Sequence, residues 1–99
     1  MRNKKNRKLI QTEHFLIRAW ERGYYSSSID KLVKEMSTTY DKSYFIINRE
    51  NLRKRGVKKT KSSYLVIVVK KNLLITLFEL NNLYEFLKAN SNARIEIIG

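Results

Sequence analysis

The residue types and spacing best suited to a chemical reaction are those of His14, Arg18 and Arg22. They follow one another at intervals of four, so a helix would project all three from one face, with Glu21 beside them. An imidazole moves protons near neutral pH, and a guanidinium holds phosphate oxygens through paired N–H donors. In metal-free RNA cleavage a base takes the 2′-hydroxyl proton, the hydroxyl attacks the phosphorus, and cations stabilise the developing charge. The set is compatible with that chemistry, but a lone His on an amphipathic helix is also typical of a solvated surface residue.

The composition speaks against most other reaction classes. The chain has 99 residues with no Cys, one His, three Gly and nine Asp or Glu. Without Cys there are no disulfides, thiolate metal sites or Cys nucleophiles, and one His cannot form a His-rich metal site. No glycosidase-type carboxylate pair, Gly-rich phosphate loop or nucleophile elbow is present. We therefore expect neither a metal nor a cofactor.

Positive charge dominates the chain, with 21 Lys and Arg and a formal net charge of +12. Seven of the thirteen residues from 49 to 61 are basic. They are Arg49, Arg53, Lys54, Arg55, Lys58, Lys59 and Lys61. Such clusters attract nucleic-acid backbones through counterion release without reading bases, although a charge run can also be a solvated face. We expect a nucleic-acid partner, with RNA ahead of DNA.

Aromatic residues could add base stacking to this charge. Tyr24 and Tyr25 follow directly on the helix that carries His14, and RNA-binding proteins stack unpaired bases on such rings. The other aromatic residues are expected mostly in the core, because strands favour Tyr and Phe.

Periodicity predicts the elements that position these residues. A helix is expected from the cap Thr12 to the stop Gly23, with its apolar side formed by Phe15, Leu16, Ala19 and Trp20. A second helix is expected over 29–36 and a third over 81–90. Strands are expected over 43–48, 64–69, 73–79 and 94–98, with a hairpin turn at 70–72. The stretch 49–62 is expected to be a long basic hairpin or loop.

The order of these elements predicts an α+β fold. Two N-terminal helices would pack on an antiparallel sheet of three or four strands, with a short helix near the C-terminus. A chain of this size builds one core, so we expect a single domain over 12–99 behind a basic arm over 1–11. No apolar run reaches the roughly 18 residues of a membrane span, and no helix has both a basic and a wide apolar face. The basic N-terminus is not followed by an apolar stretch, so we expect no export signal, no membrane partner and a cytoplasmic location.

Thr76 lies in the apolar run of the last predicted hairpin. Alternation along the strand places it on the same face as Leu74 and Phe78. Threonine is an ordinary strand residue, so its hydroxyl matters only if that face looks toward His14.

Two motifs resemble a known group of domains. They are Glu13-His14-x-x-x-Arg18-x-x-x-Arg22-Gly23, followed by a short helix, and a later hairpin that runs from 65–69 into 74–78 and contains Ile75-Thr76. The pattern resembles small bacterial and phage domains of largely unknown function, which have been grouped with the barnase–EndoU–colicin–RelE fold of RelE- and BrnT-like toxins. The resemblance covers about residues 12 to 80.

The resemblance implies a metal-independent ribonuclease of the toxin type. It implies a site formed by His14, Arg18 and Arg22 from the helix and Thr76 from the hairpin, with RNA cleaved by 2′-hydroxyl attack and His14 as general acid or base. A toxin of this kind would also need an acidic antitoxin or immunity protein. The alternative is a non-catalytic, basic nucleic-acid-binding protein of phage or mobile-element origin.

Overall fold

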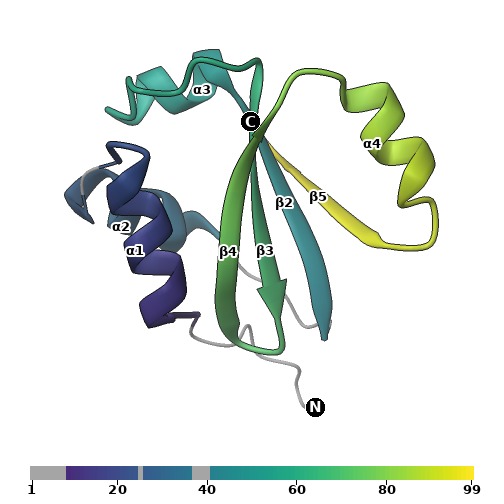
Figure 1. Cartoon of the computed structure of the whole chain (residues 1–99), viewed down its shortest axis with the longest axis horizontal. Coiled ribbons are helices and arrows are strands. Elements are labelled where there is room, and N and C mark those ends of the chain that lie inside the picture. Colours follow the sequence, from purple (N-terminus) through teal and green to yellow (C-terminus); the bar gives the residue numbers. More distant parts are fainter. Residues whose placement is uncertain (1–8, 25, 37–40) are drawn as a thin grey trace.

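The structure is a computed structural model that describes residues 9–24, 26–36 and 41–99. Its helices and strands in chain order are β1 (Ile10–Gln11), α1 (Glu13–Glu21), α2 (Ser26–Glu35), β2 (Lys42–Asn48), α3 (Arg49–Lys54), β3 (Tyr64–Lys70), β4 (Leu73–Leu80), α4 (Leu83–Ala89) and β5 (Arg94–Ile98). Figure 1 shows α1 and α2 on one side of the sheet and α4 on the other. The predicted α+β class is confirmed, but the arrangement of helices differs from the expected one, because α3 lies between β2 and β3 where no helix was predicted.

The sheet has five strands in the order β1-β4-β3-β2-β5. The central strands β2, β3 and β4 are antiparallel, whereas β1 runs parallel to β4 and β5 runs parallel to β2. The prediction of three or four antiparallel strands is therefore wrong at both edges. The two-residue strand β1 is too short to show a period, and it falls within the stretch expected to be a basic arm. The direction of β5 depends on where the chain re-enters the sheet, which local sequence does not encode.

Helix α1 starts and stops where its capping residues predict. The Thr12 hydroxyl accepts a hydrogen bond from the Phe15 N–H at 3.2 Å and donates one to the Leu74 carbonyl oxygen at 2.6 Å. It thereby caps the helix and fastens it to β4. The helix ends before Gly23, whose φ of 80° suits a residue without a Cβ.

The apolar side of α1 differs from the expected one. Phe15 and Ala19 are buried against the sheet, while Leu16 is 45% exposed and Trp20 is 79% exposed. Only one side of the predicted apolar stripe, formed by Phe15 and Ala19, is therefore buried. This orientation turns the neighbouring Arg18 toward the sheet, where it becomes partly buried.

The sheet has two chemically distinct faces. The first face packs against α1 and α2 and carries the main core, which includes Phe45, Ile47, Leu65, Ile67, Val69, Leu74 and Leu77. The second face carries Tyr44, Ile46, Val66, Val68, Thr76 and Phe78, and it meets α4 through Phe86. Among the described residues no helix is long and apolar enough to cross a membrane.

The stretch 49–62, predicted as a long basic hairpin or loop, is a loop only in its second half. It begins with α3, which is capped where the Asn48 side chain accepts the Asn51 N–H at 2.8 Å. It turns at Gly56 and continues without regular structure to β3. Leu52 and Val57, at 0% and 2% exposed, anchor this stretch in the core. Two apolar residues among many cations were too few to show a helical period.

Candidate nucleic-acid and catalytic site

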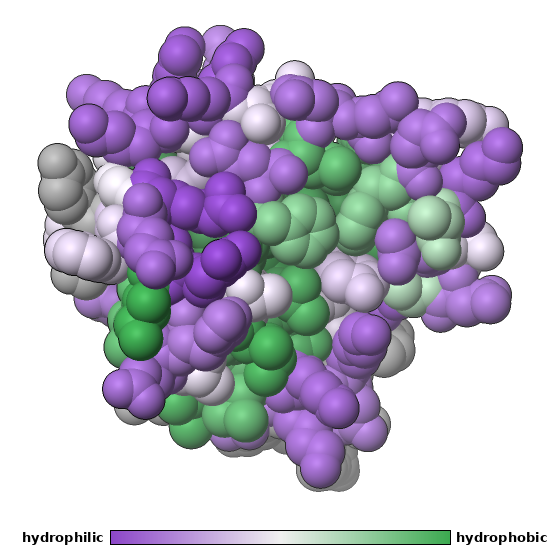
Figure 2. Space-filling view, in the orientation of Figure 1, coloured by the Kyte–Doolittle hydropathy of each residue, from purple (hydrophilic) through white to green (hydrophobic). Residues whose placement is uncertain are grey.

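Helical geometry places His14, Arg18 and Arg22 on one side of α1, and none of the three lines the cavity that Leu16 and Trp20 form with α2. These three residues are called the His14 face. His14 is exposed, whereas Arg18 and Arg22 are partly buried beside Phe15 and Ala19. Strongly hydrophilic side chains cover α1 on the side toward β4 (Figure 2). The predicted one-face arrangement of these residues is therefore present, with its two arginines next to the sheet.

Arg18 shows the clearest sign of an unfilled polar site. Its Nε atom is buried and has no hydrogen-bond partner among the described residues. A buried donor without an acceptor costs free energy, and most such donors in folded proteins are satisfied. A phosphate oxygen is an acceptor that guanidinium N–H groups bind in fixed geometry. The Arg18 guanidinium is therefore not fully satisfied by the described residues, and it is the group on the His14 face best suited to bind an oxyanion.

Tyr24 lies just beyond α1 and is a structural residue. Its ring is only 4% exposed, and its hydroxyl accepts a hydrogen bond from Thr60 at 2.9 Å and donates one to Glu79 at 3.0 Å. The other oxygen of Glu79 accepts the backbone N–H groups of Lys61 at 3.2 Å and Ser62 at 2.9 Å. This network ties the end of α1 and the basic stretch to β4. The ring of Tyr24 is therefore closed to a stacking base, and Tyr25 lies outside the described residues.

The network shifts the pKa of both of its ionisable groups. Burial, helped by the adjacent Glu79 carboxylate, raises the pKa of Tyr24 far above its usual value. Burial also acts to raise the pKa of Glu79, but hydrogen bonds from the Ser62 backbone and the Tyr24 hydroxyl outweigh it and lower that pKa. Glu79 is thus held ionised, and a carboxylate with a lowered pKa is a weak general base.

Alternation predicts the face of Thr76 correctly relative to Phe78 but not relative to Leu74. Val68 pairs with Thr76 and Val69 pairs with Leu74, so Ile75 is an extra residue in a β-bulge. The bulge leaves Leu74 on the first face, where it is fully buried, and turns Thr76 onto the second face with Phe78. The prediction that Thr76 lies on the same face of the sheet as Leu74 is therefore wrong. The His14 face and Thr76 lie on opposite sides of β4, so one ligand reaches both only around the edge of that strand.

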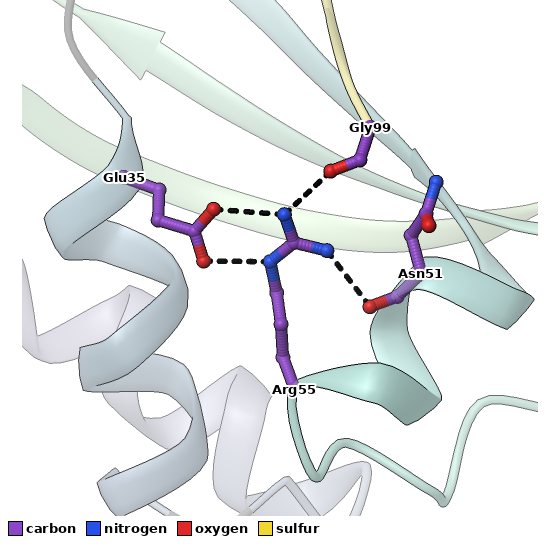
Figure 3. A network of polar contacts seen from close by, with 4 residues as sticks. All are labelled: Glu35, Asn51, Arg55 and Gly99. Atoms are coloured by element: carbon purple, nitrogen blue, oxygen red, sulfur yellow. Dashed lines mark hydrogen bonds and ion pairs between the residues drawn. The ribbon is translucent and has the colours of Figure 1, made fainter.

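Two of the predicted basic residues have structural roles. The Arg55 guanidinium bonds both carboxylate oxygens of Glu35 at 2.6 and 2.8 Å, the Asn51 carbonyl at 2.9 Å and the Gly99 carbonyl at 2.6 Å (Figure 3). It thereby clamps α2, α3 and the end of β5 together. Arg49 donates to the Lys61 carbonyl at 2.9 Å.

The other basic side chains of this stretch are exposed. They are Arg53, Lys54, Lys58, Lys59 and Lys61. Lys58 and Lys59 line a cavity of about 170 Å³ together with Gly23, at the end of α1. Part of the basic stretch therefore lies close to Arg22, at one end of the His14 face.

Another cavity belongs to a different surface. It measures about 630 Å³ and lies between α1 and α2, lined by Leu16, Trp20, Tyr24 and Ile29 among others. This cavity is on the side of α1 opposite His14, so the imidazole does not sit in it. The exposure of Trp20 was missed because the helical period grouped that residue with the core.

Among the described residues no group of three or more His, Cys, Asp or Glu side chains could hold a metal ion. Compared with protein-family models, with curated proteins and with solved structures, the chain shows no match.

Proposed function

We propose that this protein is a metal-independent ribonuclease of the toxin type. The observation that carries the proposal is the buried Nε of Arg18, which has no hydrogen-bond partner in the part of the chain that the structure describes and lies on the same helix face as the only histidine of the sequence. In this proposal a phosphodiester of RNA docks on the His14 face and supplies the missing acceptor. The acidic partner of such a toxin would be an antitoxin or immunity protein, and the site of action would be the cytoplasm.

The reaction assigns one role to each group. His14 removes the proton from the 2′-hydroxyl, the 2′-oxygen bonds to the adjacent phosphorus, and the bond from phosphorus to the 5′-oxygen breaks. The products are a 2′,3′-cyclic phosphate and a 5′-hydroxyl, whose proton comes from an acid such as the protonated imidazole or water. Arg18 and Arg22 hold the phosphate oxygens and stabilise the charge that develops on them. Thr76 contacts the RNA where it passes around β4.

The exposed cations of the basic stretch supply affinity. Lys58 and Lys59 continue the positive surface beyond Arg22, and they attract the RNA backbone whatever its sequence. Binding should weaken as the salt concentration rises, because each neutralised phosphate releases counterions.

The decisive experiment is cleavage of labelled single-stranded RNA in the presence of EDTA. Wild type should cleave it, and His14→Ala should be about 10² to 10⁴ times slower, the usual effect of losing a positioned proton-transfer group. Glu13→Gln is a matched control, because Glu13 is also exposed in the first turn of α1. An equal rate for wild type and His14→Ala would contradict the mechanism.

The second candidate is a nucleic-acid-binding protein without cleavage activity, of phage or mobile-element origin. It is favoured by the exposure of His14 to solvent and by the position of Thr76 on the other face of the sheet. It gives steeply salt-dependent RNA binding and no cleavage product at any enzyme concentration. Expression in bacteria separates the two candidates, since growth arrest that disappears in His14→Ala supports the enzyme and harmless expression supports the binding protein.

A further inference from the structure

The second face of the sheet is only partly covered. Tyr44, Val68 and Thr76 lie in one row across β2, β3 and β4, and Phe78 lies beside them in the next row. All four are partly exposed. Of the described helices, α4 lies on this face (Figure 1), and its Phe86 meets Tyr44 edge-on at 5.2 Å and Phe78 at 5.9 Å between ring centroids. Rings and a hydroxyl therefore reach the surface on the part of the sheet nearest β4.

This apolar surface has a positively charged border. The Nζ atom of Lys42 lies 5.6 Å from the centroid of the Tyr44 ring. Helix α1, which carries Arg18 and Arg22, packs against β4 (Figure 1). Figure 2 shows apolar side chains over β4 and the sheet between α1 and α4, with hydrophilic side chains on both sides. A surface with a flat apolar floor and cationic margins fits a polymer that has planar apolar groups on an anionic backbone.

We propose that the second face binds the unpaired bases of single-stranded RNA while the backbone crosses the edge of β4 to the His14 face. The proposal rests on the proposed function, since it names the form of RNA that the same site takes. Bases in a duplex are stacked inside the helix and cannot lie on a protein ring, so double-stranded RNA would contact only the cations. The hydroxyl of Thr76, with one donor and two acceptor sites, then faces the nucleotide at the crossing.

The path also explains how residues on opposite sides of β4 act on one ligand. Beyond Leu74, β4 has no strand partner on its outer side among the described residues, because β1 pairs only with Leu73 and Leu74. Within the described residues, the strand edge next to Thr76 therefore pairs with no neighbouring strand. A flexible single strand can bend around this edge, whereas a stiff duplex cannot.

The test uses a short 2′-O-methyl RNA that carries one 2-aminopurine, because methylation removes the attacking hydroxyl. Full-length protein should quench the fluorescence of the single strand by stacking, and it should bind the single strand at least about 10-fold more tightly than the same sequence in a duplex. Phe78→Leu should weaken single-strand binding by about 5-fold or more, which is the low end of the loss expected for one stacking ring. Tyr84→Leu is the matched control, because Tyr84 is 71% exposed and lies two residues before Phe86, on the opposite side of α4.

The outcomes separate this inference from the proposed function. Equal affinity for single and double strands, or no quenching by wild-type protein, overturns the inference and needs no variant. Normal single-strand binding by a folded Phe78→Leu protein also overturns the inference. It does not affect the proposed function, which depends on cleavage by His14. If neither RNA form binds, both this inference and the proposed function fail. Binding of an acidic peptide in place of RNA would assign the second face to a protein partner.

Discussion

Replacing Tyr24 with Phe should destabilise the protein strongly although the ring keeps its place in the core. The lost hydroxyl makes two hydrogen bonds, one with the neutral Thr60 and one with the ionised Glu79. A neutral bond contributes about 0.5 to 1.5 kcal/mol and a bond to a charged group about 1.5 to 3 kcal/mol. Because Glu79 keeps two backbone donors, we expect a net loss of about 2 to 3 kcal/mol in the free energy of unfolding.

In a domain of this size each kcal/mol lowers Tm by about 4 to 8 °C, so Tyr24→Phe should lower it by roughly 10 to 25 °C. Thermal unfolding followed by circular dichroism measures this, with Tyr84→Phe as a control expected to stay within about 0.5 kcal/mol of wild type. In a Thr60→Val background the effect of Tyr24→Phe should shrink, because the shared bond is already absent. A Tyr24→Phe protein as stable as wild type would refute the role assigned to this network.

Three further substitutions test other parts of the structure. Hydrogen bonds lower the pKa of Glu79, so its contribution to stability is present above the ordinary value of 4.5 and is lost as the pH falls through the lowered value. Urea unfolding at pH values below 4.5 should therefore show that acid destabilises Glu79→Gln less than it destabilises the wild type. Arg55→Lys should lower the free energy of unfolding in urea by about 1 to 2 kcal/mol, because it loses the forked contacts. Glu35→Gln changes a carboxylate that is 44% exposed and should lower it by only about 0.2 to 1 kcal/mol. Equal losses would mean that the clamp acts only as an ion pair. Gly23→Ala should cost about 1 to 2 kcal/mol because φ is 80° there, and an unchanged Tm would show that the helix end adapts freely.

Local signals in the sequence were sufficient for most of the helices and for the central hairpin. Thr12 and Gly23 fixed both ends of α1, and the helical period and the strand-like runs located α2, α4 and the strands β2 to β5 to within a few residues. These features depend on neighbours in the chain, which is why caps and periods reveal them. The parallel pairing of β1 with β4 and of β5 with β2 was not predictable in this way, because each pair joins segments far apart in the chain.

The candidate site was predictable only in part, for the same reason. The one-face arrangement of His14, Arg18 and Arg22 follows from helical geometry alone. The burial of Tyr24 does not, because its partners Thr60 and Glu79 lie 36 and 55 residues away in the chain. Nor does the orientation of Thr76, since one bulged residue reverses every side chain that follows it.

The internal roles of Arg55 and Tyr24, which were both predicted to bind nucleic acid, have a physical cause. Arg55 and Tyr24 looked available because one lies in a basic run and the other in a polar connection. In the fold each satisfies buried or partly buried groups of other segments, so their polar atoms are used internally. The lysines of the basic stretch, in contrast, are exposed to solvent, where an anionic ligand can reach them.

The central claim is that RNA phosphate binds on the His14 face, and the single histidine of the chain allows a direct measurement. In a ¹H–¹³C NMR spectrum of the full-length protein, the Cε1–Hε1 signal of the imidazole belongs to His14 alone. On titration with non-cleavable 2′-O-methyl RNA, this signal should move with the same midpoint as overall binding, and Arg18→Gln should weaken that binding and shift the midpoint to higher RNA concentration. RNA that binds tightly while the His14 signal stays in place would contradict the claim.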